Sequence, residues 1–233
     1  MTEALGFPAF PPSKGRFART WWGQAWLRAV EDTSLDTGPL KRGRRLARAG
    51  RVGPITVSPG RITAQVTDSD GVYHTAVFVD RLDDGEWRRF LDEVAAKAGH
   101  LAALLDRDMP HELVEAAAQA DVRLLPGIGD LRAECDCPDW ELCQHAAAVC
   151  SQAAWLLDAD PFLLLLLRGR AQRELTDELR ERSRKPEATT RSASGNVLSV
   201  FPPAPGVDSE AVAAAAALAV ERARTMLRDR YPS

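Results

Sequence analysis

Cysteine and histidine are concentrated in one short segment of this chain. All four cysteines and one of the four histidines lie in "ECDCPDWELCQHAAAVC", residues 134–150. Three thiolates and one imidazole form a common donor set of tetrahedral structural zinc sites, with Zn–S distances of about 2.3 Å. The segment supplies these donors as two pairs with residues 138–142 between them. It therefore predicts one structural Zn²⁺ per chain, with the ligands Cys135, Cys137, Cys143 and His145.

Other uses of clustered cysteines are weaker interpretations. A disulfide framework needs an oxidising compartment, and Cys135 and Cys137 are too close in sequence to pair comfortably. Thiol catalysis with His145 as the base would leave neighbouring cysteines without a role. A catalytic zinc ion would need an open coordination position, whereas this set fills all four. The remaining cysteine, Cys150, lies among Ala and Val, and we interpret it as a buried core thiol.

The spacing of the ligands also predicts their local structure. Residues two apart on a regular strand share a face but lie about 7 Å apart, so the chain must turn after Cys135. Pro138 disfavours helix at Cys137, which suits such a turn. The second pair lies at the start of a predicted helix, where partial positive charge stabilises a thiolate. We expect a strand–turn–helix held together by zinc.

The elements that must position this unit are predicted to be an antiparallel sheet with flanking helices, an α+β fold. Turn signals at Pro59-Gly60 and Asp70-Gly71 separate strand-like runs and predict an antiparallel meander. The expected strands are 54–58, 61–68 and 72–80, with short ones near 121–125 and 131–135. The expected helices are 18–32 with Thr20 as its cap, about 84–98, 110–119, 143–157, and a charged helix ending near 182. The first fifteen residues are predicted to be irregular.

Composition divides the chain into three parts. Residues 1–183 are expected to form one α+β domain that contains the zinc finger at about 131–157. Residues 184–208 are rich in Pro, Ser and Thr, as flexible linkers are. Residues 209–233 are predicted to form a final Ala-rich helix, so that the domain carries a helical C-terminal tail.

The sequence predicts a cytoplasmic protein. The first residues lack the charged start and apolar run of a secretory signal. The longest apolar stretches, 161–167 and 211–220, are shorter than the roughly 20 residues needed to span a bilayer. Thiols stay reduced in the cytoplasm, which suits zinc ligands.

One basic run lies in a chain whose formal net charge is only −3. Residues 39–52 contain no acid, and Gly43 and Gly50 would let a ligand approach the backbone closely. The basic side chains are Lys41, Arg42, Arg44, Arg45, Arg48 and Arg51. They predict contact with nucleic-acid phosphates, while an acidic protein partner and a solvated face remain alternatives. Trp21, Trp22 and Trp26 could stack on bases, but tryptophans at helical spacing more often belong to a core.

No catalytic signature is found in the sequence. It contains no G-x-x-x-x-G-K-[ST], G-x-G-x-x-G, H-E-x-x-H or G-x-S-x-G pattern. The other histidines, His74, His100 and His111, are interpreted as ordinary surface or core residues. We predict that the chain is not an enzyme.

The cysteine pattern resembles the SWIM zinc finger, whose signature is C-x-C, a short gap and then C-x-H. Similarity to bacterial SWIM zinc finger proteins extends over roughly residues 16–180, in "WWGQAWL", "RGRRLARAGRV", "ITVSPGRITAQV" and "DPFLLLLLRGR". The resemblance implies a zinc-binding module that contacts DNA or protein, often found with Swi/Snf-type helicase-like ATPases. That family often has a basic residue between the last Cys and His, and Gln144 stands there in this chain.

Two functions follow as hypotheses. In the first, the chain is a nucleic-acid-binding accessory protein that works alongside a helicase-like ATPase. In the second, it is a protein-interaction subunit or scaffold whose zinc finger is purely structural. The acid-poor basic run favours the first hypothesis, and the linker with its final helix favours the second.

Overall fold

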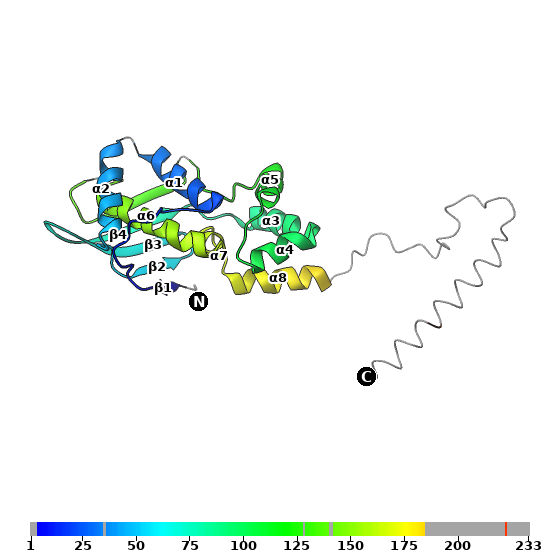
Figure 1. Cartoon of the computed structure of the whole chain (residues 1–233). Coiled ribbons are helices and arrows are strands. Elements are labelled where there is room, and N and C mark those ends of the chain that lie inside the picture. Colours follow the sequence, from blue (N-terminus) through cyan, green and yellow to red (C-terminus); the bar gives the residue numbers. More distant parts are fainter. Residues whose placement is uncertain (1–3, 35, 128, 140–141, 185–221, 223–233) are drawn as a thin grey trace. The chain divides into compact units, whose positions relative to one another are not determined.

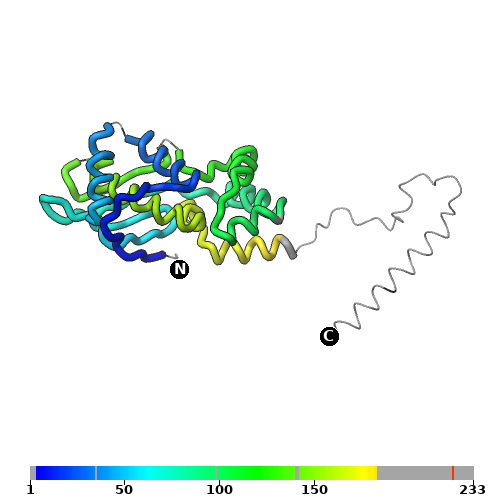
Figure 2. The backbone as a smooth tube through the Cα atoms, viewed as in Figure 1, coloured from blue at the N-terminus to red at the C-terminus, as the bar shows by residue number. Residues whose placement is uncertain are grey.

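The computed structural model describes residues 4–34, 36–127, 129–139, 142–184 and 222 (Figures 1 and 2). The predicted linker over 184–208 lies outside this part of the chain beyond Arg184, and the predicted helix over 209–233 does so apart from Arg222. The proposed division into domain, linker and tail therefore stays a prediction. All helices and strands below belong to the compact unit Met1–Arg184.

Five antiparallel strands form one sheet in chain order, which confirms the predicted α+β fold and its meander. The strands are β1 (Leu5–Phe7), β2 (Ile55–Ser58), β3 (Arg61–Asp68), β4 (Gly71–Val79) and β5 (Leu131–Cys135). Strand β1 corrects the expectation of an irregular start, because Leu5 pairs with Val57 and Phe7 pairs with Ile55. Backbone pairing with a sheet edge created a strand that propensity alone did not predict.

The strand expected at 121–125 is not formed. Val122 and Leu124 are buried and alternate with exposed Asp121 and Arg123, as the pattern suggested. Asp121, however, has a φ of 56° and lies in a turn, and none of the strands that the structure describes pairs with this segment. Period-two burial here reflects packing of a turn against helices rather than membership of a sheet.

Four helices build a layered core with the sheet. They are α1 (Trp21–Thr33), α2 (Thr37–Arg48), α6 (Gln144–Ala159) and α7 (Phe162–Leu167). Helices α6 and α7 lie against the strands, and α1 and α2 pack on α6 (Figure 1). Alternate residues of β3, namely Ile62, Ala64 and Val66, point into this core. Helix α6 is therefore buried on nearly all sides, which its run of Ala, Val and Leu permits.

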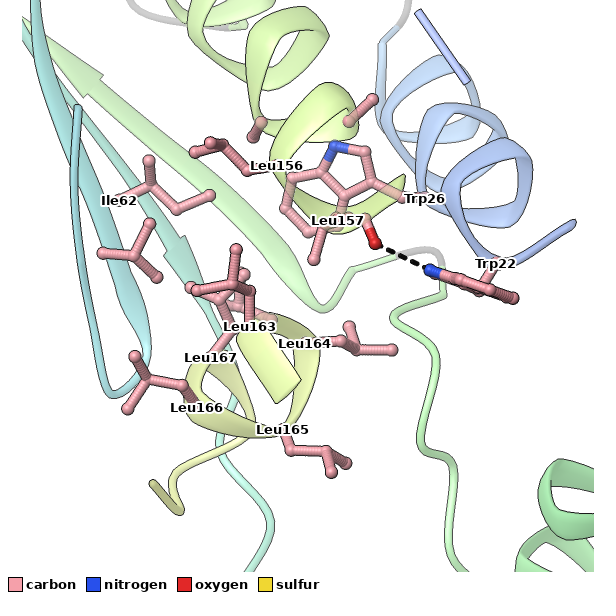
Figure 3. Close-up of a cluster of buried hydrophobic side chains, with 14 of the residues drawn as sticks. Trp22, Trp26, Ile62, Leu156, Leu157, Leu163, Leu164, Leu165, Leu166 and Leu167 are labelled. Atoms are coloured by element: carbon pink, nitrogen blue, oxygen red, sulfur yellow. Dashed lines mark hydrogen bonds between the residues drawn. The ribbon is translucent and has the colours of Figure 1, made fainter. Parts of the chain in front are cut away.

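Two of the three tryptophans of α1, Trp22 and Trp26, are core residues, whereas Trp21 is partly buried and stacks on His111. Trp26 is fully buried, and its Nε1 donates to the carbonyl oxygen of Cys150 at 3.0 Å. Trp22 donates from Nε1 to the carbonyl oxygen of Leu157 at 2.7 Å, beside the leucines of α7 (Figure 3). Thr20 caps α1 by accepting from the Gly23 amide, as predicted. The rings of Trp22 and Trp26 fix α1 against α6 and are not free to stack on bases.

The remaining helices form a second group, here called the helical cluster. It consists of α3 (Asp84–Ala96), α4 (Ala98–Leu105), α5 (His111–Gln119) and α8 (Gln172–Arg184). The helix expected at about 84–98 is α3, which ends at Ala96 because Lys97 adopts an extended conformation, and α4 was not predicted. Trp87, Phe90 and Leu91 on α3 are buried. Along the chain, α3, α4 and α5 are inserted between β4 and β5, although these two strands pair directly in the sheet.

Among the described residues, no helix combines the length and apolar character needed to cross a membrane.

Candidate metal centre

The four predicted ligands meet at one point. One donor atom from each of Cys135, Cys137, Cys143 and His145 lies within 4.8 Å of the others. Cys135 ends β5, Cys137 lies in the following turn, Cys143 is the N-cap of α6, and His145 lies in its first turn. The predicted strand–turn–helix is thus formed, and the sheet and α6 bring its two ends together.

The sheet register holds the first thiol in place. Cys135 pairs with Thr75 across β4 and β5, and the Thr75 hydroxyl lies 3.4 Å from the Cys135 sulfur. After this residue the Asp136 amide still donates to the His74 carbonyl oxygen at 3.3 Å. The chain then leaves the sheet, which lets Cys137 turn back toward the same point.

The helix start holds the second thiol. The sulfur of Cys143 accepts a hydrogen bond from the Ala146 amide at 3.4 Å, as a cap side chain does. Unpaired amides and the helix dipole at this end favour negative charge on the sulfur. Burial nevertheless raises the pKa of the Cys143 thiol strongly, and burial also raises the pKa of Cys137. A bound cation would supply the charge that keeps such thiols deprotonated.

The imidazole of His145 is held by the β3–β4 hairpin. Its Nδ1 lies 3.6 Å from the Cys135 sulfur and 3.9 Å from the Cys143 sulfur, so Nδ1 is the atom that faces the other donors. The ring is 3% exposed and stacks on Tyr73, with centroids 4.1 Å apart. Its Nε2 points the other way, toward the Asp68 carboxylate at 3.4 Å. Tyr73 and Asp68 therefore orient the imidazole from two sides.

The residues present fit a structural zinc ion. Three sulfurs and one nitrogen converge, and all four positions of a tetrahedral ion are filled by protein atoms. Zinc bound here would join the end of β5 to the start of α6. It would add no open position for a substrate, so its chemistry would be structural.

Comparison with known proteins agrees with this geometry. The family model described as the SWIM zinc finger matches residues 120–154, from the end of α5 through β5 into α6. The chain contains a SWIM zinc finger. This match and the Cys₃His cluster support one structural zinc per chain.

A longer relative extends the similarity beyond the SWIM finger. The chain is 32% identical over 170 residues to the uncharacterized protein Rv2102 of Mycobacterium tuberculosis. The aligned region covers 72% of this chain and 61% of that protein, so the chain spans less than two thirds of its relative. No solved structure matches.

Cys150 lies outside the metal centre. It is 1% exposed on the inner side of α6, and burial raises the pKa of its thiol to about 12. The interpretation as a core thiol is confirmed.

The six basic residues singled out from the sequence do not form one uniform surface. Five are exposed: Lys41, Arg42, Arg45, Arg48 and Arg51. Arg44 is partly buried and pairs with Glu31 on α1. The guanidinium of Arg48 lies over the Phe17 ring, 4.9 Å from its centroid. Arg44 and Arg48 thus contact side chains of α1 and of the segment before it.

Three of the arginines lie beside the SWIM finger. Arg42, Arg45 and Arg51 line a surface cavity of about 450 Å³. Its other walls include Asp68 and Ser69 of the hairpin and Gln144 of the finger. We call this cavity the arginine pocket. The side chain of Gln144, which stands between the last two ligands, accepts from Arg42 Nε at 2.7 Å.

Gly43 serves a different contact from the one expected. A Cβ atom on it would lie 2.6 Å from the Gln144 carbonyl oxygen and 2.8 Å from the Ala148 amide nitrogen. The absence of a side chain therefore lets α2 lie against α6 rather than opening the backbone to a ligand.

Sequence reasoning missed the residues that surround the ligands. Asp68, Tyr73 and Thr75 come from the hairpin, 60 to 77 positions before the ligands that they contact. The Asp70-Gly71 signal predicted the turn but not what would pack on it. His74 was interpreted as an ordinary residue, yet its Nδ1 lies 3.1 Å from the Asp136 carboxylate, inside the finger. The pairing of β4 with β5 brings Thr75 and His74 to the finger, and the contact of α6 with β3 and β4 brings Asp68 and Tyr73 to His145.

Proposed function

We propose that this chain binds the phosphates of nucleic acid through the arginine pocket. The observation that carries the proposal is the position of Arg42, Arg45 and Arg51 around one cavity that the SWIM finger also lines. Guanidinium groups are planar and can donate two parallel hydrogen bonds to one phosphate. A pocket with three of them can hold more than one backbone oxygen at a time.

Contact would be with the backbone rather than with base edges. No array of base-reading side chains is evident around the pocket, whose remaining walls are Leu46, Ala49, Thr67, Asp68, Ser69 and Gln144. Phosphate contacts position a protein on nucleic acid but carry little sequence information. We therefore infer weak sequence preference and place single strands beside duplex as candidate ligands.

The biological setting is part of the same proposal. We infer a binding module rather than an enzyme, acting in the cytoplasm as an accessory to a larger machine such as a Swi/Snf-type helicase-like ATPase. The support is the SWIM finger itself and a metal set that leaves no open position. Copurification of the native protein with its partners tests this part.

Fluorescence anisotropy with labelled oligonucleotides over a range of salt tests the phosphate contacts. Each phosphate on a single strand contributes about −0.7 to the slope of log K against log salt, so three contacts give about −2. Replacing Arg42, Arg45 and Arg51 by Ala should flatten that slope while zinc content stays at one per chain. The matched control replaces Arg88, Arg173 and Arg180, which are exposed on the helical cluster. Equal slopes for the two triple variants would exclude the arginine pocket.

A second candidate function is a protein-interaction subunit with a purely structural finger. It is favoured by the internal partners of Arg44 and Arg48, which reduce the free basic surface of α2. Absence of oligonucleotide binding at low salt, with partners still copurifying, would place this function first.

A further inference from the structure

The buried Nε2 of His145 faces the carboxylate of Asp68, a residue outside the C-x-C and C-x-H ligand pattern. His145 directs Nδ1 toward the cysteine sulfurs, so Nε2 points away from the metal centre. This Nε2 is buried, and none of the described residues forms a hydrogen bond with it. Oδ2 of Asp68 lies 3.4 Å from it, and the Asp68 side chain is only 18% exposed. A small closure would make this contact a hydrogen bond.

The carboxylate of Asp68 is itself fixed in position. Its Oδ2 accepts from Gln144 Nε2 at 2.6 Å, and its Oδ1 accepts from the Ser69 amide at 2.7 Å. Neither of these donors carries a charge, so the negative charge of Asp68 stays available to His145. Tyr73 of β4 stacks on the imidazole and limits its tilt.

A histidine that binds a metal through one nitrogen commonly donates its other N–H to a carboxylate. This contact fixes the tautomer and the ring orientation, and it raises the basicity of the ligating nitrogen. With zinc on Nδ1, the proton of His145 must lie on Nε2, where Asp68 is the acceptor within reach. The arrangement therefore has the parts of a carboxylate–histidine–zinc triad.

We propose that Asp68 is a positioning residue of the zinc site: it accepts the Nε2 proton of His145 and holds the Nδ1 lone pair toward the metal. The residue belongs to β3 and lies outside the matched finger, residues 120–154. The zinc site of this chain thus includes a part of the sheet that the finger's own sequence does not contain.

Zinc affinity of the full chain tests the role of Asp68. Asp68→Asn replaces the charged acceptor with a neutral amide of the same size, and we expect zinc to bind about 10–100-fold more weakly in chelator competition. Asp70→Asn is the matched control, because Asp70 is an exposed carboxylate two positions away in the same turn. Its zinc affinity should stay within about twofold of wild type. Equal affinities for the two variants would overturn the proposal.

A purely structural role for Asp68 is distinguished by the zinc-free protein. Loss of the Ser69 and Gln144 contacts would lower stability with and without metal, whereas loss of positioning should lower it only with zinc bound. We therefore expect the zinc-free wild type and Asp68→Asn to unfold at the same denaturant concentration. An equal destabilisation in both states would show that Asp68 supports the hairpin alone.

The wild-type protein supplies a measurement that needs no variant. In the zinc-bound chain, ¹⁵N NMR should show His145 protonated at Nε2, with a proton slow to exchange with water. A rapidly exchanging Nε2 proton, or zinc bound through Nε2, would contradict the proposal even if Asp68→Asn failed to fold.

Discussion

The metal centre lies at the Cys135 end of the β4–β5 pair, whereas α3, α4 and α5 of the helical cluster are inserted at the end where Val79 pairs with Leu131, and the two regions are held together by different forces. In the helical cluster, Trp87, Phe90 and Leu91 are 2% exposed or less and pack on other apolar side chains. In the metal centre, Cys135 and Cys137 are only partly buried, and the turn between them offers few apolar groups. Burial is sufficient for the first region, whereas the second needs metal–ligand bonds to close a short polar turn.

The difference predicts that zinc stabilises the metal centre and leaves the stability of the helical cluster unchanged. Cys143→Ser removes one ligand, and we expect the zinc content to fall from one per chain to near zero. With free zinc a thousandfold above its dissociation constant in the wild type, the lost binding lowers the free energy of unfolding by about 4 kcal/mol. Elemental analysis and thermal unfolding with and without a chelator measure both effects.

Two control variants sharpen that comparison. Cys150→Ala changes a cysteine on the same helix but outside the cluster, so it should keep its zinc. Leu113→Ala creates a cavity in the helical cluster and should cost about 3 kcal/mol whether or not zinc is present. A metal-free wild type that is as stable as the zinc-bound protein would contradict the contrast between the regions.

A glycine-to-alanine change should lower the stability at Gly43, where α2 lies against the start of α6, and raise it at Gly99 in the helical cluster. Gly43→Ala on α2 places a methyl group against backbone atoms of α6, and overpacking of this kind should destabilise by about 2 kcal/mol. Gly99→Ala on α4 meets no atom within 4 Å and should stabilise by about 0.5–1 kcal/mol through helix propensity. Denaturant unfolding of the two variants gives the signs directly, and destabilisation by both would refute the close approach at Gly43.

A further predicted effect is a pH dependence of stability that arises from ionisation of Cys150. Burial raises the pKa of this thiol to about 12, whereas an unfolded cysteine has a pKa of about 8.5. Between these values the unfolded chain releases a proton that the folded chain keeps, so stability is complete below pH about 8.5 and falls as pH rises. We expect the contribution lost by pH about 9.5 to be about 1 kcal/mol.

Urea unfolding of wild type and Cys150→Ala at several pH values isolates this contribution. The variant lacks the thiol, so its free energy of unfolding should decrease less between pH about 7.5 and 9.5 than that of the wild type. Parallel pH profiles would mean that Cys150 is not protected from ionisation in the folded protein.

Much of the fold could be predicted because its signals are local. The Pro59-Gly60 and Asp70-Gly71 turns set the two hairpins, and the observed β3 matches its predicted range of 61–68. Strand β1 was missed because it exists only through pairing with β2. The helix expected at 84–98 was too long because its apolar period continues across the break at Lys97.

The candidate site, like the fold, could be predicted from the sequence only in part. The donor residues of the metal centre could be found from their types and their spacing within eleven positions. The basic residues of α2 could be found as a run, but their separation into arginine pocket, Glu31 pair and Phe17 contact could not. Which arginines remain free depends on side chains from α1, the hairpin and the finger.

By itself the sequence determined the set of zinc donors. The residue types that zinc prefers as ligands lie within a few positions of one another along the chain, so they could be recognised without the fold. The sequence also determined the meander and most helices, because turn residues and apolar periods act over short stretches. The tertiary structure alone decided that Asp68 and Tyr73 meet His145, and that Gln144 links Asp68 to Arg42. These contacts join segments about seventy to a hundred positions apart, and sheet register and the packing of α2 on α6 are what bring them within reach.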